Sequence, residues 1–325
     1  MNTTGLGSVA GRGSAVWPWR LATATCRKKW MSHFFRLFFC VTIKGRAKGG
    51  MSMLWRCPVC GAELQEEEKG GVCPQGHRFD KARSGYLNLL PPSGKKTREP
   101  GDNKEMIRAR WSFLQKGYYA PLADLAGEIT LGEGKPPLRM LDAGCGEGYY
   151  SQRLWENAQK SGWEIEIYGM DISKFAVDRA AKGLKQGRYA VGSLYHLPLG
   201  EEAVDVIWNF FAPHCPEEFA RVLRKNGRLL VAVPGKRHLW ELKERLYDEP
   251  YENPGTAPHL SGFLLEETRP VTYPMALSGE DVWSLFQMTP YFYKTDPQRR
   301  ESLSQAHGME ITADFLLLCY RKEEG

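Results

Sequence analysis

The sequence has no hydrophobic run long enough to cross a membrane. The apolar stretch at residues 33–43 is short and is interrupted by Arg36, whereas a spanning helix needs about 20 apolar residues. No small-residue cleavage signature follows an apolar run, so the pattern of a secretory signal is missing as well. We therefore expect no membrane partner and no secretion.

A disulfide framework is also missing. Of the eight cysteines, three cluster with a histidine at metal-ligand spacing and one, Cys145, lies in a glycine loop. Cysteines used in this way are typical of a reducing compartment. The sequence therefore predicts a cytoplasmic protein.

The body of the chain lacks the basic charge that many RNA-binding proteins carry. The formal net charge is +6, but residues 1–50 hold nine Lys and Arg and no acidic residue. The rest of the chain has 35 of the 44 basic residues against all 38 acidic ones. Overall charge thus gives no support for RNA binding, and any RNA must be bound through local patches.

Residues 1–50 show no helical or strand period, and we expect an unstructured extension there. Their Arg-rich, acid-free composition would also suit a transit peptide. We favour a mis-assigned start, with Met51 or Met53 as the true first residue. The reason is that Lys-Gly-Gly at 48–50 is what a purine-rich ribosome-binding site encodes when it is read in frame. Peptides from upstream of Met51 in a mass spectrum of the native protein would contradict this interpretation.

A metal site is predicted where two tight ligand pairs are separated by a short loop. Cys57 and Cys60 form the first pair, and Cys73 and His77 form the second after twelve intervening residues. A chain surrounds a tetrahedral zinc ion in this way, and Pro and Gly within the pairs favour the turns it needs. Three thiolates and one imidazole fill all four positions, so a structural zinc site is expected. The spacing disfavours the alternative, a chance cluster of buried cysteines.

A module this small cannot bury a core without its metal. It could also present a face to nucleic acid, because aromatic side chains stack on unpaired bases and cations hold phosphates. Such residues interleave after the ligands: Phe79, Lys81, Arg83, Tyr86, Lys95, Lys96 and Arg98. A solvated charged linker explains them equally well.

The segment that follows is predicted to be a linker and two entry helices. Residues 91–101 are rich in Pro, Gly and charge. Asp102 and Glu105 resemble a capping box and predict a helix over 103–116. A second helix is expected over 122–129.

A cofactor loop is predicted directly after a short apolar strand. Asp142 ends this strand, and Gly144, Gly146 and Gly148 follow in a G-x-G-x-G pattern that leads into a helix. Glycine at such a turn lets the backbone approach a ligand closely. Dinucleotide-binding folds use G-x-G-x-x-G at this place. The variant found here is typical of class I methyltransferases that use S-adenosylmethionine (SAM), whose loop accommodates the methionine portion of the cofactor.

Strands and helices then alternate, which predicts an α/β fold with a parallel doubly wound sheet. The second strand ends at Asp171, which is placed to accept both ribose hydroxyls. Ser193 and Leu194 follow the third strand, where the adenine should lie. The fourth strand opens into a pocket loop at 209–213, and a turn at Gly227 is expected before the fifth strand.

The C-terminal third is predicted to contain helices over 238–246 and near 280–287, an irregular stretch at 251–261 and a final strand at 309–322. This strand is expected to form part of an antiparallel pair that closes the sheet edge. Five aromatic residues could line a base pocket, although core packing suits most of them better. They are Trp283, Phe286, Tyr291, Phe292 and Tyr293.

With these features together, the chain resembles the RlmA/RrmA-type ribosomal RNA guanine-N1 methyltransferases, which include the tylosin-resistance methyltransferase. The resemblance runs from about Trp55 to near the C-terminus and leaves out residues 1–50. The strings that carry it are CPVCG…VCPQGHRFDKARSGYLNLLP, REPGDNKEMIRARWSFLQKGYYAPL, LDAGCGEGYY, FFAP, PGKRHLWELK and YPMALSG…LFQMTPY. The zinc-module and linker strings are the most specific, because many methyltransferases share the glycine loop.

The resemblance implies a class I, Rossmann-like methyltransferase fold with an antiparallel last strand and a small N-terminal zinc-ribbon-like module. We expect the zinc module at 51–92, the linker and entry helices at 93–137 and the SAM-dependent methyltransferase domain at 138–325. The implied zinc ligands are Cys57, Cys60, Cys73 and His77. The implied SAM contacts are Tyr119, Gly146, Glu147 and His238, with Asp171 as the ribose ligand.

The implied substrate is a guanine N1 in a hairpin of the large-subunit ribosomal RNA, which the zinc module would help to recognise. No residue shows which guanine is modified, and a homodimer is left open. Transfer to N1 needs a group that removes the N1 proton. Asn209, His214 and Asp205 lie near the pocket by motif position, and none of them stands out as the base. The guanine must also be accessible, so a loop or splayed base is expected.

Two other functions stay open. A small-molecule methyltransferase with a structural zinc module would share the whole cofactor half, but the zinc module and its flanks argue against it. A non-catalytic zinc RNA-binding protein is disfavoured by the intact glycine loop and Asp171. Cofactor binding without RNA methylation would favour the first alternative, and absence of cofactor binding would favour the second.

Overall fold

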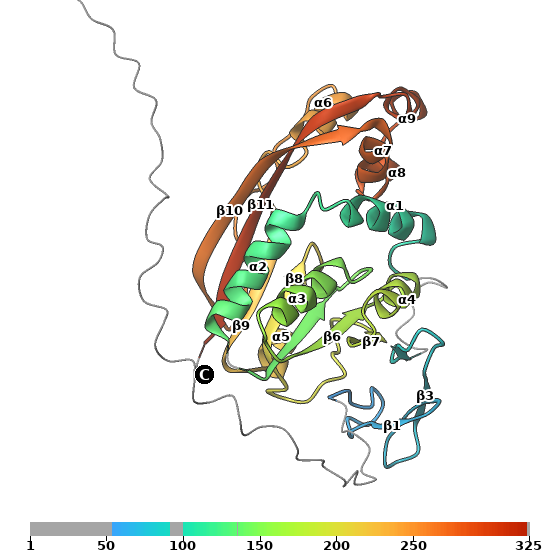
Figure 1. Cartoon of the computed structure of the whole chain (residues 1–325), viewed down its shortest axis with the longest axis vertical. Coiled ribbons are helices and arrows are strands. Elements are labelled where there is room, and N and C mark those ends of the chain that lie inside the picture. The colour runs from blue at the N-terminus through green and yellow to red at the C-terminus, as the bar shows by residue number, and fades with distance from the viewer. Residues whose placement is uncertain (1–53, 92–99, 135, 324–325) are drawn as a thin grey trace, which may run out of the picture. The chain divides into compact units, whose positions relative to one another are not determined.

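The computed structural model describes residues 54–91, 100–134 and 136–323. The extension expected at 1–50 and the basic residues Lys95, Lys96 and Arg98 lie outside these ranges. The described residues form one three-stranded and one eight-stranded sheet (Figure 1). Within them, none of the helices combines the length and the apolar character that a membrane span requires.

The small sheet belongs to the N-terminal module. β1 (Gln65–Glu67), β2 (Gly70–Val72) and β3 (Arg78–Asp80) pair antiparallel in that order. β4 (Leu87–Asn88) then pairs in parallel with β7 (Arg188–Val191) of the large sheet. The module is thus hydrogen-bonded to the edge of the main sheet.

Side chains of the module continue the core of the main domain. Trp55 is 1% exposed, and its ring lies 5.3 Å from that of Tyr168 in an edge-to-face arrangement. Trp55 also forms an isolated bridge with Leu199, and the Arg56 N–H donates to the carbonyl of Pro198 at 2.7 Å. Large aromatic side chains dominate the burial energy of such contacts, so the module is part of the main fold.

The large sheet has the order β10-β11-β9-β8-β5-β6-β7-β4. Its other strands are β5 (Leu138–Ala143), β6 (Ile165–Asp171), β8 (Val204–Phe210), β9 (Leu223–Pro234), β10 (Phe263–Ser278) and β11 (Gly308–Lys322). β11 pairs antiparallel with both of its neighbours, whereas the pairs on the other side of β9 are parallel. This confirms a mostly parallel sheet whose last strand is antiparallel.

The final strand does not itself lie at the edge. β11 lies between β9 and β10, and β10 forms the edge. The sequence did not identify β10, because residues 264–270 of this strand are all exposed and therefore show no two-residue alternation of apolar side chains.

Helices cover both faces of the sheet, as alternating side chains require. In β5, Leu138 and Met140 contribute to one core cluster, and Leu141 and Ala143 contribute to the other. The helices are α1 (Lys104–Gln115), α2 (Ala120–Glu133), α3 (Tyr149–Lys160), α4 (Lys174–Gly183), α5 (Pro216–Val222), α6 (Trp240–Leu246), α7 (Gly279–Gln287), α8 (Tyr291–Lys294) and α9 (Pro297–Ser304). Figure 1 shows α6 to α9 gathered at the upper ends of β10 and β11, above α1.

Two local expectations were wrong. The N-cap of α1 is Asn103, whose Oδ1 accepts the N–H groups of Glu105 and Met106, both at 3.0 Å. Asp102 instead forms an ion pair with Arg110. Gly227 lies inside β9, and the residue in the left-handed region is its neighbour Asn226, with φ 60°, since Asn tolerates this conformation better than most residues.

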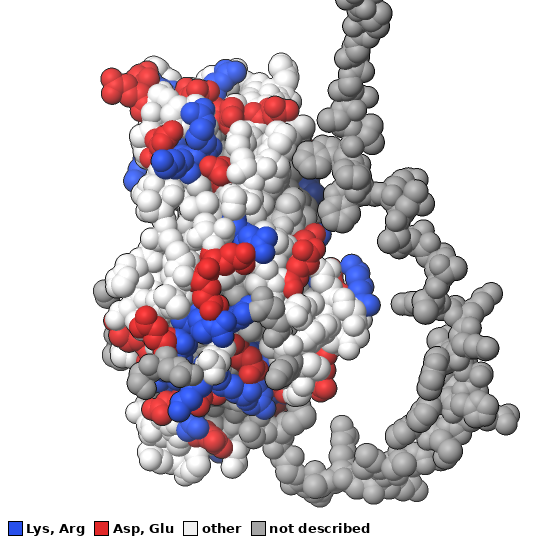
Figure 2. Space-filling view, turned by 90° about the vertical axis from the view of Figure 1, so that its left-hand side faces the viewer, with Lys and Arg blue, Asp and Glu red and all other residues white. Residues whose placement is uncertain are grey.

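Charges of both signs are interspersed on the face that Figure 2 presents. The described residues of this face show no extended area of basic charge alone. This agrees with the near balance of acidic and basic residues outside the N-terminal segment.

Candidate cofactor and zinc sites

The four predicted zinc ligands come together in space. Their ligand atoms all lie within 4.8 Å of one another. Cys57 Sγ and Cys73 Sγ are 3.5 and 3.3 Å from His77 Nδ1, and Cys60 Sγ is 3.6 Å from Cys73 Sγ. Ligands at about 2.3 Å from a tetrahedral zinc ion are separated by roughly 3.5–4 Å. The cluster therefore fits a closed zinc site.

Each ligand pair is held on a glycine turn. The Gly61 N–H donates to the Cys57 carbonyl at 2.8 Å, and the Gly76 N–H donates to the Cys73 carbonyl at 2.9 Å. Both glycines have a positive φ, 72° and 84°, which side chains disfavour. Burial opposes ionisation of Cys73, but hydrogen bonds with the backbone of His77 and with Cys60 lower its pKa to about 6. This favours the thiolate, the form that binds metal.

The residues after the ligands are less available for RNA than their pattern indicates. Phe79 and Tyr86 pack partly buried against the two core clusters. Lys81 pairs with Glu66 at 2.7 Å. Arg83 is exposed. Packing against the core accounts for both aromatic residues.

The three glycines of the cofactor loop all have a positive φ, of 88°, 53° and 82°. A Cβ on Gly144 would lie 2.4 Å from the Cβ of Ala212, and one on Gly148 would lie 2.8 Å from that of Ala180. Gly144 and Gly148 are thus required for close packing. A Cβ on Gly146 would meet only Arg110 Nη1, at 3.5 Å, so Gly146 borders the space where a ligand can approach.

Two acids flank this loop. Asp142 is 2% exposed and accepts a hydrogen bond from the Ser151 hydroxyl, and burial raises its pKa to about 7. Asp171 accepts the N–H of Gly146 at 3.1 Å and that of Ser173 at 2.8 Å. Burial raises the pKa of Asp171, and these N–H groups and Arg110 oppose the shift. A carboxylate has four lone-pair positions, so Asp171 can still accept hydroxyl groups.

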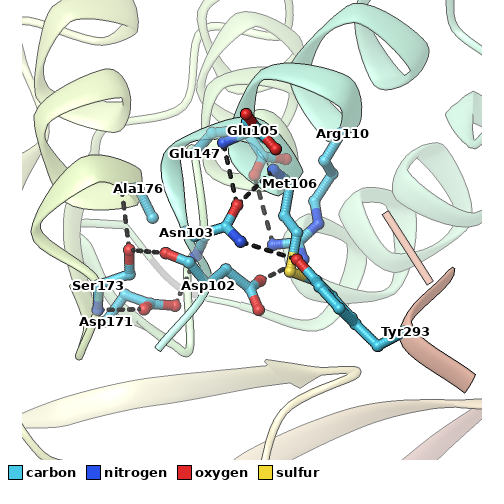
Figure 3. Close-up of polar contacts among 11 residues, drawn as sticks. Asp102, Asn103, Glu105, Met106, Arg110, Glu147, Asp171, Ser173, Ala176 and Tyr293 are labelled. Carbon is cyan, nitrogen blue, oxygen red and sulfur yellow. Dashed lines mark hydrogen bonds and ion pairs between the residues drawn. The ribbon is translucent and has the colours of Figure 1, made fainter. Parts of the chain in front are cut away.

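Arg110, on α1, is the residue of this site that the sequence did not single out. Figure 3 shows its guanidinium close to Asp102 and Glu147, beside the glycine loop. Glu147 is 3% exposed, and its Oε2 lies 3.7 Å from Arg110 Nη1. Burial raises the pKa of Glu147 to about 7, although Arg110 opposes the shift. In the sequence, Arg110 could have been found only through the string RARW, which is part of a longer string that carries the resemblance.

Tyr119 and His238 meet although 118 residues separate them in the chain. Their rings are 6.2 Å apart, and both contact Phe315 of β11, at 4.8 and 4.6 Å. His238 Nδ1 accepts the N–H of Asp314 at 3.3 Å. Burial, and then the nearby Lys243, lower the pKa of His238 to about 3. His238 is therefore neutral at neutral pH, and its ring packs with Tyr119 and Phe315 as an aromatic group.

Ser193 and Leu194 lie beside the same loop. Leu194 Cδ1 is 3.8 Å from the position that a Cβ on Gly144 would occupy. Ser193 Oγ accepts the N–H of Tyr195 at 3.3 Å, and Ser193 forms a bridge with His196. The turn after β7 is thus held against the glycine loop.

The three candidate bases, Asp205, Asn209 and His214, differ in their position relative to the glycine loop and in their hydrogen bonds. Asp205 lies at the start of β8, where it accepts the N–H of Arg139 at 2.8 Å and pairs with Arg224 at 2.6 Å. The glycine loop is at the other end of the strands, so Asp205 cannot reach a substrate there. Asn209 is fully buried, and its amide group donates to the carbonyls of Ala143 and Pro213, at 2.8 and 3.3 Å.

His214 is the titratable candidate at the end of the sheet where the glycine loop lies. Its Nδ1 lies 2.6 Å from Asn209 Oδ1. That oxygen can only accept, because the nitrogen of the same amide donates elsewhere, so His214 Nδ1 carries the proton. Burial lowers the pKa of His214. The neutral imidazole therefore leaves Nε2 as an acceptor, and none of the described residues donates a hydrogen bond to it.

Phe211 is a second residue that only the structure singles out. It has φ 55° and is 43% exposed, directly after β8. Its ring lies 5.5 Å from Phe315 and 6.4 Å from both Tyr119 and Tyr150. A bulky residue held in the left-handed region is a marker of functional sites. The string FFAP was the only sequence signal.

Most of the C-terminal aromatic residues form core. Phe286 is fully buried and packs with Trp283 and Phe292 at ring distances of 5.7 and 5.2 Å. Tyr293 is 54% exposed, and its hydroxyl accepts a hydrogen bond from Asn103 Nδ2 at 2.7 Å. The structure therefore favours core packing for this group, as the sequence indicated for most of it.

Comparisons with known proteins match both parts of the chain. A family model described as the N-terminal part of RlmA, a zinc ribbon, matches residues 55–98, and a methyltransferase-domain model matches 135–288. A 23S rRNA (guanine(748)-N(1))-methyltransferase from Streptomyces fradiae is 33% identical over 275 residues, which cover 80% of this chain and 94% of that protein. A putative 23S rRNA (guanine-N(1)-)-methyltransferase from Micromonospora griseorubida is also 33% identical, over 82% of this chain and 96% of that protein.

Among solved structures, the YcgJ protein from Bacillus subtilis aligns with a TM-score of 0.42 and 19% identity, over 62% of this chain and 98% of that one. The domain boundaries at 51, 93 and 138 stay predictions. The chain is an enzyme that uses SAM and carries a zinc ribbon. It belongs to the RlmA-type family of 23S rRNA (guanine-N1)-methyltransferases.

Proposed function

We propose that this protein transfers the methyl group of SAM to N1 of a guanine in a hairpin loop of 23S ribosomal RNA. One observation carries the proposal beyond family membership. A cavity of about 850 Å³ is lined by Arg56 and Pro58 of the zinc module together with Ser193, His196 and Arg221 of the main domain. A substrate large enough to touch the zinc module can therefore also reach the turn beside the glycine loop.

The geometry supports a division of the cofactor site among three parts of the fold. In this proposal, Asp171 accepts the ribose hydroxyls, the turn after β7 borders the adenine, and the glycine loop borders the methionyl part. Bound SAM supplies an electrophilic methyl group on its sulfonium, so positioning of the guanine is the main task of the protein. The residues proposed to form the cofactor site are Tyr119, Asp142, Gly144, Gly146, Glu147, Gly148, Asp171, Ser193, Leu194 and His238.

The zinc site has a structural role in this proposal. Cys57, Cys60, Cys73 and His77 would hold the ion, which cross-links the two turns of the module. His214 is proposed to take the proton from guanine N1, because its neutral Nε2 can accept a proton and lies at the end of the sheet where the glycine loop is. The reaction would take place in the cytoplasm, and a homodimer stays a prediction.

A methylation assay tests the function. Protein starting at Met53 is incubated with labelled SAM and unmodified 23S RNA, and primer extension maps the product, since a methyl on N1 blocks base pairing. We expect a stop at one guanine of a hairpin loop and no stop with the Asp171→Ala variant. Cofactor binding without label on any RNA would instead favour a small-molecule substrate, and absence of cofactor binding would favour a non-catalytic RNA-binding protein.

A further inference from the structure

Two opposite charges face each other over the glycine loop, and neither uses its full hydrogen-bonding capacity. Arg110 donates from Nη2 to Asp102. Its Nη1 has only a 3.7 Å contact with Glu147, which is too long for a hydrogen bond. Glu147 Oε2 is buried and has no hydrogen-bond partner among the described residues.

A buried carboxylate oxygen without a partner is costly, and native structures rarely leave one unexplained. A guanidinium offers five N–H donors, and the described contacts of Arg110 use one of its nitrogens. The pair therefore presents both a free acceptor and free donors to the same space. A group that carries an ammonium and a carboxylate on one carbon would satisfy both.

The position of the pair points to the cofactor. Glu147 is the neighbour of Gly146, and a Cβ on Gly146 would meet only Arg110. Asp171 binds the N–H of the same glycine. Asp171, which is assigned to the ribose, and the pair Arg110–Glu147 thus border the same residue of the loop. In SAM the sulfonium and a short carbon chain join the ribose to the α-amino acid group.

The charge balance of the cluster disfavours a ligand that would place a diphosphate here. Asp102 and Glu147 lie beside a single Arg110 (Figure 3), and the charge of Asp171 also acts on it. A diphosphate would be repelled by three carboxylates and would meet only one cation. SAM has a sulfonium, an ammonium and one carboxylate, and its net positive charge suits this surrounding.

Arg110 is held in place before any ligand binds. Asp102 fixes one end of the guanidinium, and the carbonyl of Asp102 accepts a hydrogen bond from Ser173 Oγ at 2.8 Å. Asn103 caps the helix that carries Arg110. A guanidinium that is already oriented binds a carboxylate more strongly than a mobile one.

We infer that Arg110 binds the α-carboxylate of the methionyl part of the cofactor and that Glu147 binds its α-ammonium. The inference rests on the proposed function in one respect, since it takes SAM as the cofactor. It assigns Arg110, which neither the resemblance nor the comparisons single out, as an anchor for an α-amino acid group.

Three ligands separate the contacts by calorimetry. S-adenosylhomocysteine has both α-substituents, decarboxylated S-adenosylhomocysteine keeps only the amine, and 5′-methylthioadenosine has neither. We expect Arg110→Gln to weaken S-adenosylhomocysteine about 10- to 100-fold, as for a lost charged hydrogen bond, and to leave the other two ligands unchanged. Glu147→Gln should weaken both amine-bearing ligands and spare 5′-methylthioadenosine. Arg108→Gln is the matched control, because Arg108 is exposed on the same helix, and it should change none of the affinities.

Equal weakening of all three ligands by Arg110→Gln would overturn the inference and leave Arg110 as a support of the loop. Unchanged affinity for S-adenosylhomocysteine would also overturn it. Failure of the proposed function would be seen in a different result. Wild-type protein that binds S-adenosylhomocysteine but does not methylate 23S RNA would contradict the RNA substrate. The comparison of the three ligands would still decide the role of Arg110.

Discussion

Phe211 shows that a single residue can store strain next to a site. Its φ of 55° costs a non-glycine residue about 1–2 kcal/mol. Phe211→Ala and Phe211→Gly both remove the ring. The difference between their free energies of unfolding therefore measures the strain of the backbone at this position. We expect the Gly variant to be more stable than the Ala variant by about 1 kcal/mol in urea unfolding. At Ala212, whose φ is not positive, replacement by Gly should destabilise. Equal stability of the two Phe211 variants would show that no strain is released.

The proposed base predicts a pH dependence. Burial lowers the pKa of His214 below its ordinary 6.5. The neutral imidazole is the active form, so kcat should stay high as the pH falls to 6.5 and decline only below the lowered pKa. His214→Gln should lower kcat about 10²- to 10⁴-fold and remove this acidic decline. His307→Gln, at an exposed position, is the control. A His214→Gln variant with the wild-type pH profile would assign the base elsewhere.

At the scale of elements, α1 links the cofactor loop to the C-terminal helices. Asn103 caps α1 through Oδ1 and donates through Nδ2 to Tyr293 of α8. Asn103→Ala loses both contacts and should cost about 1 kcal/mol of unfolding free energy. Asn103→Asp keeps the cap and loses only the donor, so it should be the milder change. Because α1 carries Arg110, the Ala variant should also bind S-adenosylhomocysteine more weakly. An Asp variant as unstable as the Ala variant would show that the link to Tyr293 matters more than the cap.

At the scale of the whole molecule, the zinc module is part of one folded unit with the sheet. Trp55, Leu64 and Cys73 share a core cluster with residues of the main domain, while the loop residues Cys145 and Tyr149 belong to the other cluster. Removal of zinc should therefore lower the thermal midpoint of the entire protein, because the metal is needed to order the module. Affinity for S-adenosylhomocysteine should change much less.

Calorimetry with and without a strong chelator measures both effects. Cys60→Ser should reproduce the lowered midpoint without a chelator. Cys215→Ser, at a buried cysteine outside the metal cluster, should keep the sensitivity to chelator. An unchanged main transition after zinc loss would mean that the module and the sheet unfold independently.

The sequence by itself determined the features whose residues lie close together in the chain. The zinc ligands fall within 21 residues and carry their own turn glycines, and the glycine loop combines Asp142, three glycines and the strand before them. The parallel, doubly wound character of the sheet followed from the alternation of strand and helix. Local chemistry sets all of these, so spacing reveals them.

Only the tertiary structure decided which distant residues meet. Arg110 of α1 approaches Glu147 of the glycine loop, and Tyr119, His238 and Phe315 converge from three parts of the chain. Motif position could not separate Asp205 from His214, because the direction of β8 places them at opposite ends of the sheet. The position of β11 between β9 and β10 was equally hidden, since strand order depends on packing across the whole sheet and not on any local pattern.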